Sequence, residues 1–124
     1  MRIASHSALC FMLGMSSVFA SGDGEQLSLQ KRVLASPESA KSGERIFNST
    51  CAYCHGHRGR GGQGRPLNKR SFEAGRWFKI ISEGRTRGSK RMPSFEASLN
   101  EEQRWQLIAY LQTLNDNHDK AKEQ

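Results

Sequence analysis

Residues 51–55 read CAYCH, and the interpretation of the whole chain depends on this stretch. Two thiols three positions apart, followed at once by an imidazole, are the attachment signature for c-type haem, because the thiols add to the two vinyl groups and the histidine becomes an axial iron ligand. The chain has 3 cysteines, and Cys10 lies in an apolar N-terminal leader. The motif therefore predicts one haem c, bound covalently through Cys51 and Cys54, with His55 on the iron.

A disulfide or a zinc site is the alternative use of these residues. A bridge between Cys51 and Cys54 would close a very small loop, and such pairs are usually redox-active in βαβ surroundings, which this sequence lacks. A tetrahedral zinc site needs about four ligands, and the two thiols, His55 and His57 are too crowded along the chain to supply them unaided. Both alternatives are weaker than haem attachment.

The first 20 residues have the pattern of a secretory signal peptide. Arg2 precedes an apolar run over residues 8–15, and Val18 and Ala20 place small or aliphatic side chains where a signal peptidase cuts. We expect cleavage after Ala20. A retained anchor is the alternative, but the apolar run is shorter than the roughly 20 residues that span a bilayer. The expected location is periplasmic, without stable membrane insertion, since haem attachment in bacteria takes place outside the cytoplasmic membrane.

The rest of the chain predicts one small domain. Residues 21–36 show no sustained helical or strand period, so we expect an extended N-terminal arm, either packed on the domain or mobile. Residues 37–116 form the domain, and residues 117–124 form a polar C-terminal tail. A covalently bound macrocycle would supply the apolar interior that is marginal in a domain of this size.

Three helices are expected in the domain. The first begins at Ser36, a capping residue followed by proline, and runs to the haem motif. The second is expected to be capped by Ser71 and to end at Gly84. The third opens with the elements of a capping box from Asn100 to Gln103. Its apolar stripe consists of Trp105, Ile108, Leu111 and Leu114.

Two loops connect these helices. Five glycines fall within residues 56–64, a density that excludes helix and strand, and the loop ends at Pro66. Phosphate binding is disfavoured, because the Walker spacing with its Lys-Ser/Thr pair is absent. Residues 85–91 are expected to form a polar loop that leads to Met92.

The order of these expected helices, loops and motifs resembles that of the small mono-haem class I cytochromes c of bacteria. The matching features are Gly43 and Phe47 ahead of the motif, the loop that ends at Pro66, Met92 followed by proline, and the terminal helix, over about residues 38–115. The resemblance implies an all-α cytochrome c fold, with three main helices and loops wrapped around one covalently bound haem. It also implies that the first and last helices cross near Gly43, Phe47 and Tyr110.

The resemblance makes His55 and Met92 the axial ligands. It also makes the carbonyl of Pro66 the acceptor of the His55 ring N–H, a bond that fixes ring orientation and ligand basicity. The spacing between the two ligands is shorter than the commonest family pattern. Met92 has independent support, because the other methionines of the 4 in the chain lie in the leader. The competing sixth ligands, His57 and His118, are both expected at the surface.

Charge is unevenly distributed along this basic chain, whose formal net charge is +7. Residues 58–91 hold eleven Lys or Arg against two Glu, in the segments that the resemblance places around the haem. A nucleic-acid partner is disfavoured, because an exported chain rarely meets nucleic acid and no base-stacking aromatic pattern is present. We expect steering toward an acidic redox partner, with anionic membrane headgroups as a weaker possibility. The expected docking residues are Lys90, Arg91, Arg58 and Arg60.

The chemistry expected from the sequence is one-electron transfer. No hydrolytic triad or paired-carboxylate site is visible, so we expect a carrier and not an enzyme. A His/Met iron can cycle between Fe(III) and Fe(II) without losing a ligand, and methionine raises its potential. The expected protein is a monomeric shuttle between a dehydrogenase or quinol-oxidising complex and an oxidase or reductase. Two alternatives stay open: a dedicated subunit of a larger oxidoreductase, and a ligand sensor or peroxidase with a displaceable Met92.

Overall fold

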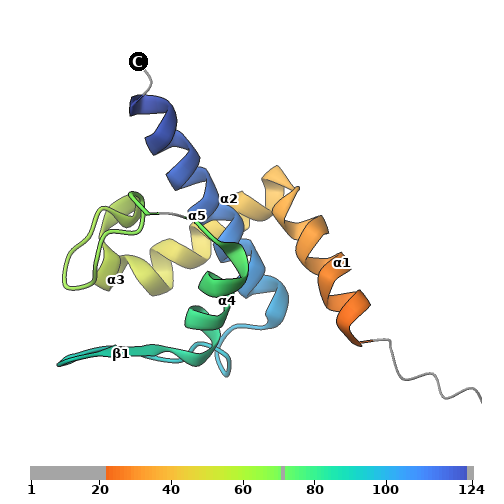
Figure 1. Cartoon of the computed structure of the whole chain (residues 1–124), viewed down its shortest axis with the longest axis horizontal. Coiled ribbons are helices and arrows are strands. Elements are labelled where there is room, and N and C mark those ends of the chain that lie inside the picture. The colour runs from red at the N-terminus through yellow and green to blue at the C-terminus, as the bar shows by residue number, and fades with distance from the viewer. Residues whose placement is uncertain (1–21, 71, 123–124) are drawn as a thin grey trace, which may run out of the picture.

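The structure of the chain, a computed structural model, describes residues 22–70 and 72–122, except for the side chains of His118 and Lys122 (Figure 1). The predicted signal peptide lies outside the described residues. The described part is mostly helical, as predicted. Its helices are α1 (Gly22–Leu34), α2 (Pro37–Ile46), the π-helical turn η1 (Phe47–Cys51), α3 (Ala52–His55), the short 3-10 turn η2 (His57–Gly59), α4 (Ala74–Glu83) and α5 (Glu101–Lys122).

Residues 22–34 form helix α1, so the expectation of an extended arm over residues 21–36 is wrong. The helix packs against α5, and Val33, only 2% exposed, joins the core. Leu29 and Leu34 pack against the same core, whereas residues 22–28 are exposed. The buried side chains of α1 all lie in its C-terminal half. The sequence of α1 therefore shows no apolar period along the whole helix. Tertiary contact makes this segment a helix.

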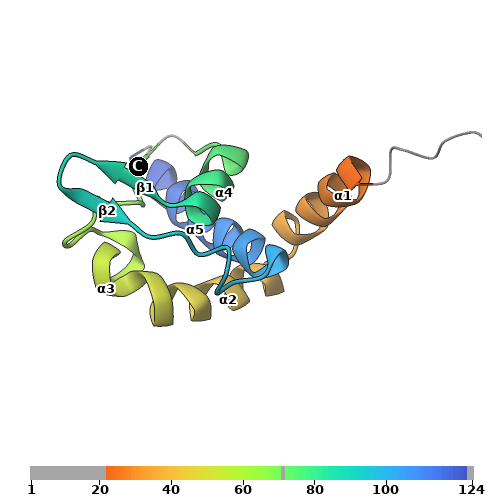
Figure 2. The ribbon, with the colours of Figure 1, turned by 90° about the horizontal axis from the view of Figure 1, so that it is seen from below.

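Helices α2 and α5 cross at very short distance (Figures 1 and 2). A Cβ atom at Gly43 would lie 1.9 Å from the carbonyl oxygen of Gln106 and 3.0 Å from the Cβ of Tyr110, so only glycine allows this approach. One turn further along, the fully buried ring of Phe47 lies 5.3 Å from that of Tyr110, centroid to centroid. The predicted crossing near Gly43, Phe47 and Tyr110 is confirmed.

The predicted starts of α2 and α5 are also confirmed. At α2, the Oγ of Ser36 accepts a hydrogen bond from the backbone N–H of Ser39 at 3.3 Å. At α5, Asn100 and Gln103 cap each other: each backbone N–H donates to the other's side-chain oxygen, at 2.9 Å in both directions. This reciprocal bonding satisfies two donors that the first helical turn would otherwise leave unpaired.

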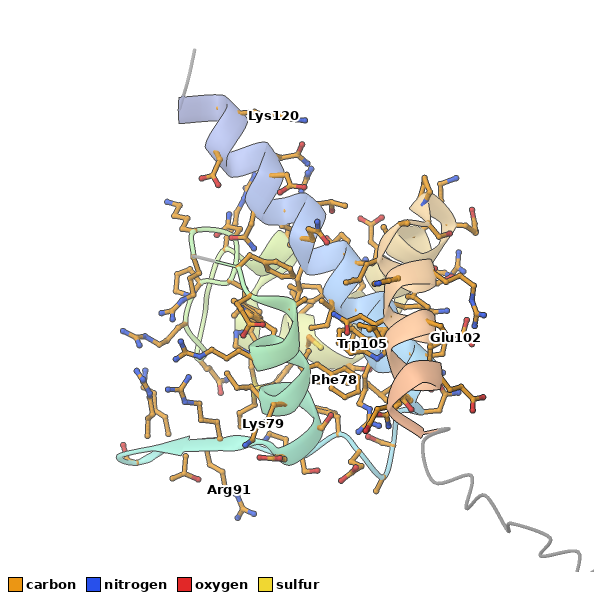
Figure 3. All side chains as sticks on the ribbon, turned by 45° about the vertical axis from the view of Figure 1, so that its right-hand side comes forward. Phe78, Lys79, Arg91, Glu102, Trp105 and Lys120 are labelled. Carbon is orange, nitrogen blue, oxygen red and sulfur yellow. The ribbon has the colours of Figure 1, made fainter. Side chains whose placement is uncertain are left out.

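Helix α4 begins differently from the prediction. Ser71, its predicted cap, lies outside the described residues, and the capping side chain that the structure shows is Glu73. Its carboxylate accepts from the first free N–H groups of the helix, at 3.0 and 2.8 Å. Gly84 ends the helix with φ of +77°, as predicted. On the inner side of α4, the ring of Phe78 stacks on Trp105 of α5, with 4.1 Å between centroids (Figure 3).

Residues 85–92 form an antiparallel hairpin where a polar loop was expected. Its strands are β1 (Arg85–Arg87) and β2 (Lys90–Met92). The register pairs Arg85 with Met92, Thr86 with Arg91 and Arg87 with Lys90. Gly88 takes φ of +58° in the connecting turn, a conformation typical of tight hairpins. Since strands made of Arg and Lys show no alternation of apolar and polar residues, the sequence pattern could not reveal them.

Helix α5 provides most of the core. The buried cluster consists of Val33, Phe47, Ile81, Leu99, Trp105, Leu107, Ile108, Tyr110, Leu111 and Leu114. The polar residues expected to form a separate tail from residue 117 continue the helix as far as Lys122. In the described ranges, every helix is too short or too polar to cross a bilayer.

Candidate functional site

The CAYCH motif lies at the end of the helical segment that begins with α2. The π-helical turn η1 ends at Cys51, and the single turn of α3 carries Cys54 and His55. Cys51 is half-buried against the core, Cys54 is exposed, and both thiols are free. The two thiols and the imidazole are therefore presented together, with no disulfide between Cys51 and Cys54.

The environment of Cys51 disfavours a zinc site. Burial, and after it the neighbouring Cys54, raises the pKa of this thiol to about 11. Zinc binds thiolate, so a zinc ion would have to displace the proton of this half-buried thiol. Over the described ranges, no group of three or more His, Cys, Asp or Glu side chains is placed to hold a metal ion.

The glycine-rich loop holds the ring of His55. Nδ1 of the ring lies 2.9 Å from the carbonyl oxygen of Arg65. A Cβ atom at Gly64 would lie 2.8 Å from both Cε1 and Nδ1, so the loop backbone packs directly against the imidazole. Because a carbonyl can only accept a hydrogen bond, Nδ1 carries the proton, and the lone pair of Nε2 is left for a metal ion.

The acceptor of this bond was expected to be the carbonyl of Pro66, and that expectation is wrong by one residue. The Pro66 oxygen accepts instead from Nε of Arg70, at 3.0 Å. Both carbonyls lie in the predicted part of the loop. The orientation of consecutive peptide planes decides which one faces the ring, and residue types do not reveal that orientation.

Backbone hydrogen bonds explain why the loop is so rich in glycine. The N–H of Gly61 donates to the carbonyl of His55, and the N–H of Gly64 donates to the carbonyl of Cys54, both at 2.7 Å. A Cβ atom at Gly56, where φ is +73°, would lie 2.3 Å from the Gly61 oxygen. The loop folds back tightly over α3, and only residues without a side chain permit it.

Asn115 anchors the far end of the loop, and the sequence analysis missed it. This side chain is 4% exposed. Its Oδ1 accepts from the N–H of Arg70 at 3.1 Å, and its Nδ2 donates to the carbonyls of Leu67 at 3.0 Å and Leu111 at 2.9 Å. An asparagine directly after the apolar stripe of α5 was the only available signal.

Met92 ends strand β2, half-buried against the core. Side chains alternate along a strand, so Met92 and Lys90 share one face of the hairpin. Nζ of Lys90 lies 3.5 Å from the carbonyl oxygen of Gln63 in the glycine-rich loop. The face that carries Met92 is therefore turned toward the loop that holds the His55 ring. In the view of Figure 2, β2 runs between α3 and β1.

These residues fit a haem iron site. The imidazole of His55 has a free Nε2, and Met92, the only methionine in the described ranges, supplies a thioether; both are common axial donors to haem iron. His57, one of the competing ligands, is exposed in η2. The side chain of the other, His118, lies outside the described residues.

The four expected docking residues are all exposed, but they form two separate groups. Lys90 and Arg91 belong to β2 and project from opposite faces of the hairpin, with Arg91 pointing away from α4 (Figure 3). Arg58 and Arg60 border a shallow hollow beside the C-terminal half of α5. A single partner surface covering all four residues is not evident from this arrangement.

Comparisons with known proteins show the family of the chain. Residues 38–111 match the protein family described as cytochrome C oxidase, cbb3-type, subunit III. The cbb3-type cytochrome c oxidase subunit FixP of Sinorhizobium medicae (strain WSM419) is 31% identical, over 82% of this chain and 41% of that protein. The chain thus spans less than half the length of this curated relative.

A solved structure shares the fold. The crystal structure of cytochrome CL from the marine methylotrophic bacterium Methylophaga aminisulfidivorans MPT matches with a TM-score of 0.60 and 19% identity, over 91% of this chain and 85% of that one. Sequence identity this low shows the fold alone. The predicted architecture is confirmed, with α1 and the β-hairpin as additions.

Proposed function

The chain belongs to the cytochrome c family described as cytochrome C oxidase, cbb3-type, subunit III, and from this we propose that it transfers single electrons through one haem c. Cys51 and Cys54 bind the haem through thioether bonds, and Nε2 of His55 and the sulfur of Met92 are the axial ligands. Haem held by this pair supplies a reversible Fe(III)/Fe(II) couple at a potential that the methionine raises. The protein is then an electron carrier and not an enzyme in its own right.

The bond between His55 and Arg65 is the observation that carries this proposal. It fixes the tautomer and the orientation of the ring, and it increases the basicity of Nε2. Gly64 leaves the ring no room to turn on that side. A solvent-exposed surface histidine needs neither restraint, whereas a permanent iron ligand benefits from both.

The segment that follows Met92 is tied to α4 in the same way. The hydroxyl of Ser94 donates to the carbonyl of Ser82, and the N–H of Phe95 donates to the carbonyl of Ile81 at 3.0 Å. An electron carrier must keep both ligands in place in both oxidation states. These bonds and the loop anchored by Asn115 both support that requirement.

We further propose that the protein works in the periplasm, as a monomer, after removal of residues 1–20. The signal-peptide pattern of the leader supports the location. The excess of basic over acidic residues and the exposed basic side chains around the site support an acidic protein partner. The donor is a dehydrogenase or quinol-oxidising complex, and the acceptor is an oxidase or reductase.

A dedicated subunit of an oxidase is the second candidate, because the curated relative FixP is itself an oxidase subunit. Such a subunit needs a persistent apolar contact. The groove between α1, α4 and α5 offers a limited one: its lining includes Phe78, Trp105 and Leu27, which is 49% exposed, among residues that are mostly polar or charged. A complex held at this groove would survive high salt, whereas an encounter steered by charge would not.

The test uses protein made in a host that can mature c-type cytochromes. Its mass in denaturant should exceed that of the processed chain by one haem. The ferric protein should show the weak near-infrared band of sulfur-to-iron charge transfer. Met92→Ala should abolish that band and lower the reduction potential, and the matched variant His57→Ala should change neither. A mass equal to the bare polypeptide would exclude covalent haem. A band that survives in Met92→Ala would exclude Met92 as the ligand.

A further inference from the structure

Arg104 is the one charged side chain that is buried in the part of the chain that the structure describes, with 8% of it exposed. Its Nη1 donates to the hydroxyl oxygen of Ser82 at 3.0 Å and lies 3.6 Å from a carboxylate oxygen of Glu96. Its guanidinium carbon lies 4.9 Å from the centre of the Phe78 ring, within the range of a cation–π contact. These contacts join the first turn of α5 to α4 and to the segment that follows Met92.

Burial of this guanidinium costs free energy that its partners only partly offset. Its Nε has no hydrogen-bond partner among the described residues. The carboxylate of Glu96 is 69% exposed, so water screens its attraction to Arg104. An apolar side chain of similar volume can often replace a buried charge without loss of stability. General stabilisation of the fold therefore does not explain why a guanidinium occupies this position.

The segment that follows Met92 lies directly on the C-terminal end of α4. A Cβ atom at Gly84, the residue that ends α4, would lie 2.7 Å from the carbonyl oxygen of Met92. The N–H of Phe95 donates to the carbonyl of Ile81 at 3.0 Å. The position of the Met92 backbone is thus set by how closely this segment stays on the end of α4.

The contacts of Arg104 and those of the Met92 segment meet at Ser82. The carbonyl of Ser82 accepts from the hydroxyl of Ser94, and its own hydroxyl oxygen accepts from Nη1 of Arg104. Ser82 is 6% exposed, so water does not compete freely for either bond. The same Nη1 lies beside Glu96, two residues beyond Ser94. One nitrogen atom of α5 therefore contacts both the end of α4 and the segment that lies on it.

We propose that Arg104 is a positioning residue for Met92. Through Ser82 and Glu96 it holds the segment after Met92 on the end of α4, and it thereby resists displacement of the Met92 sulfur from haem iron by a competing ligand. Displacement requires the segment to lift, and contacts made only in the closed arrangement add to the free energy of that opening. The ligand part of this proposal rests on the proposed function, whereas the attachment of the segment to α4 does not.

Hydrogen exchange of the haem-loaded protein tests the attachment. The probe is the amide of Phe95, which bonds to the carbonyl of Ile81 and exchanges when the segment lifts from α4. In Arg104→Met this amide should exchange about tenfold faster, the lower end for loss of a hydrogen bond to a charged group. The amide of Tyr110, in the middle of α5, should change less.

Two further variants show whether the effect is specific. The control Arg45→Met removes an exposed arginine of α2 whose Nη2 donates to the hydroxyl of Ser42 at 2.9 Å, the same kind of bond at the surface. It should behave as the unmodified protein. Ser82→Ala removes only the acceptor hydroxyl and should also speed exchange at Phe95. Combined with Arg104→Met it should add little, because both substitutions break the same bond.

Imidazole titration of the ferric protein tests the hold on Met92. Imidazole competes with the thioether for iron, and loss of the sulfur-to-iron charge-transfer band reports the displacement. We expect imidazole to bind roughly five- to tenfold more tightly to Arg104→Met than to the unmodified protein, the lower range for coupling between two sites. A side chain that served stability alone would lower the midpoint of denaturant unfolding and leave the imidazole affinity unchanged.

Several outcomes would overturn the proposal. These are exchange at Phe95 that is unchanged in Arg104→Met, or no faster relative to that of Tyr110, and an imidazole affinity equal to that of the unmodified protein. Fully additive effects of Arg104→Met and Ser82→Ala would exclude action through Ser82. If the unmodified protein lacks the sulfur-to-iron band, ligation by Met92 fails. The amide of Phe95 then still decides whether Arg104 holds the segment on α4.

Discussion

The Nδ1 atom of His55 lies 2.9 Å from the carbonyl oxygen of Arg65, ten residues further along the chain. The bond closes the glycine-rich loop over α3, and it is the only side-chain hydrogen bond that the structure records for this ring within the described ranges. Both the orientation of the imidazole and the path of the loop therefore depend on the space that Gly64 leaves beside the ring.

Gly64→Ala should disturb this arrangement. The added Cβ would start 2.8 Å from the ring, so either the ring or the loop must move and the bond to Arg65 weakens. A weaker bond makes Nε2 less basic and favours Fe(II), so the reduction potential should rise. The stability cost should be about 1–3 kcal/mol. Redox titration and denaturant unfolding measure the two effects. Gly24→Ala, which meets nothing within 4 Å, is the control. Unchanged values for both quantities would contradict the tight packing at Gly64.

Gly43→Ala should be more damaging. Its Cβ would fall 1.9 Å from the backbone oxygen of Gln106, and backbone cannot move aside as a flexible side chain can. Separating α2 from α5 also loosens the contact between Phe47 and Tyr110. We expect a loss of about 3 kcal/mol or more, at or beyond the upper end for overpacked cores. Thermal unfolding of the haem-loaded protein measures it. In the same assay Gly24→Ala should be neutral or stabilise by up to about 1 kcal/mol.

The two helix caps could be predicted because each depends on a local residue requirement, and the helix crossing was implied by the family resemblance. Close approach of two backbones needs a residue such as Gly43, and caps need side chains such as Ser36 and Asn100. Helix α1 could not be predicted, since its stability comes from Val33 packing on α5, a contact between distant segments. The hairpin was hidden for a different reason. Its strands contain positive charge where a strand pattern requires alternation, and its pairing depends on the turn at Gly88.

Some residues of the candidate site could likewise be predicted from the sequence, and others could not. The spacing of Cys51, Cys54 and His55 is what covalent haem attachment requires, so the motif alone is enough to predict these three residues. The partner of the His55 ring depends on the direction of one carbonyl, and the prediction named Pro66 in place of Arg65. Asn115 is beyond the reach of pattern analysis, because its role arises only when the loop folds against α5.

Asn115→Ala should release the loop from α5. Three hydrogen bonds are lost, and the backbone groups of Leu67 and Arg70 are left without their partner. A buried polar group that loses its bond costs about 1–3 kcal/mol. Amides of residues 67–70 should also exchange faster. The matched variant is Asn117→Ala, the same substitution at an exposed position two residues further along the helix. If the two variants lose equal stability, Asn115 is not the anchor.

Charge reversal on β2 distinguishes the two faces of the hairpin. Lys90 shares the face of Arg85 and Arg87, whereas Arg91 projects from the other face, so Lys90→Glu should slow electron transfer to an acidic partner far more than Arg91→Glu. We expect roughly a tenfold fall in the second-order rate constant at low salt, the lower end for steered association. The difference should vanish as salt screens the charges. The measurement is stopped-flow reduction or oxidation against ionic strength. Equal effects of both variants would argue against docking through the hairpin face that carries Lys90. A flat profile for the unmodified protein would favour a subunit held by contacts other than charge, for which the groove beside Leu27 is the candidate surface.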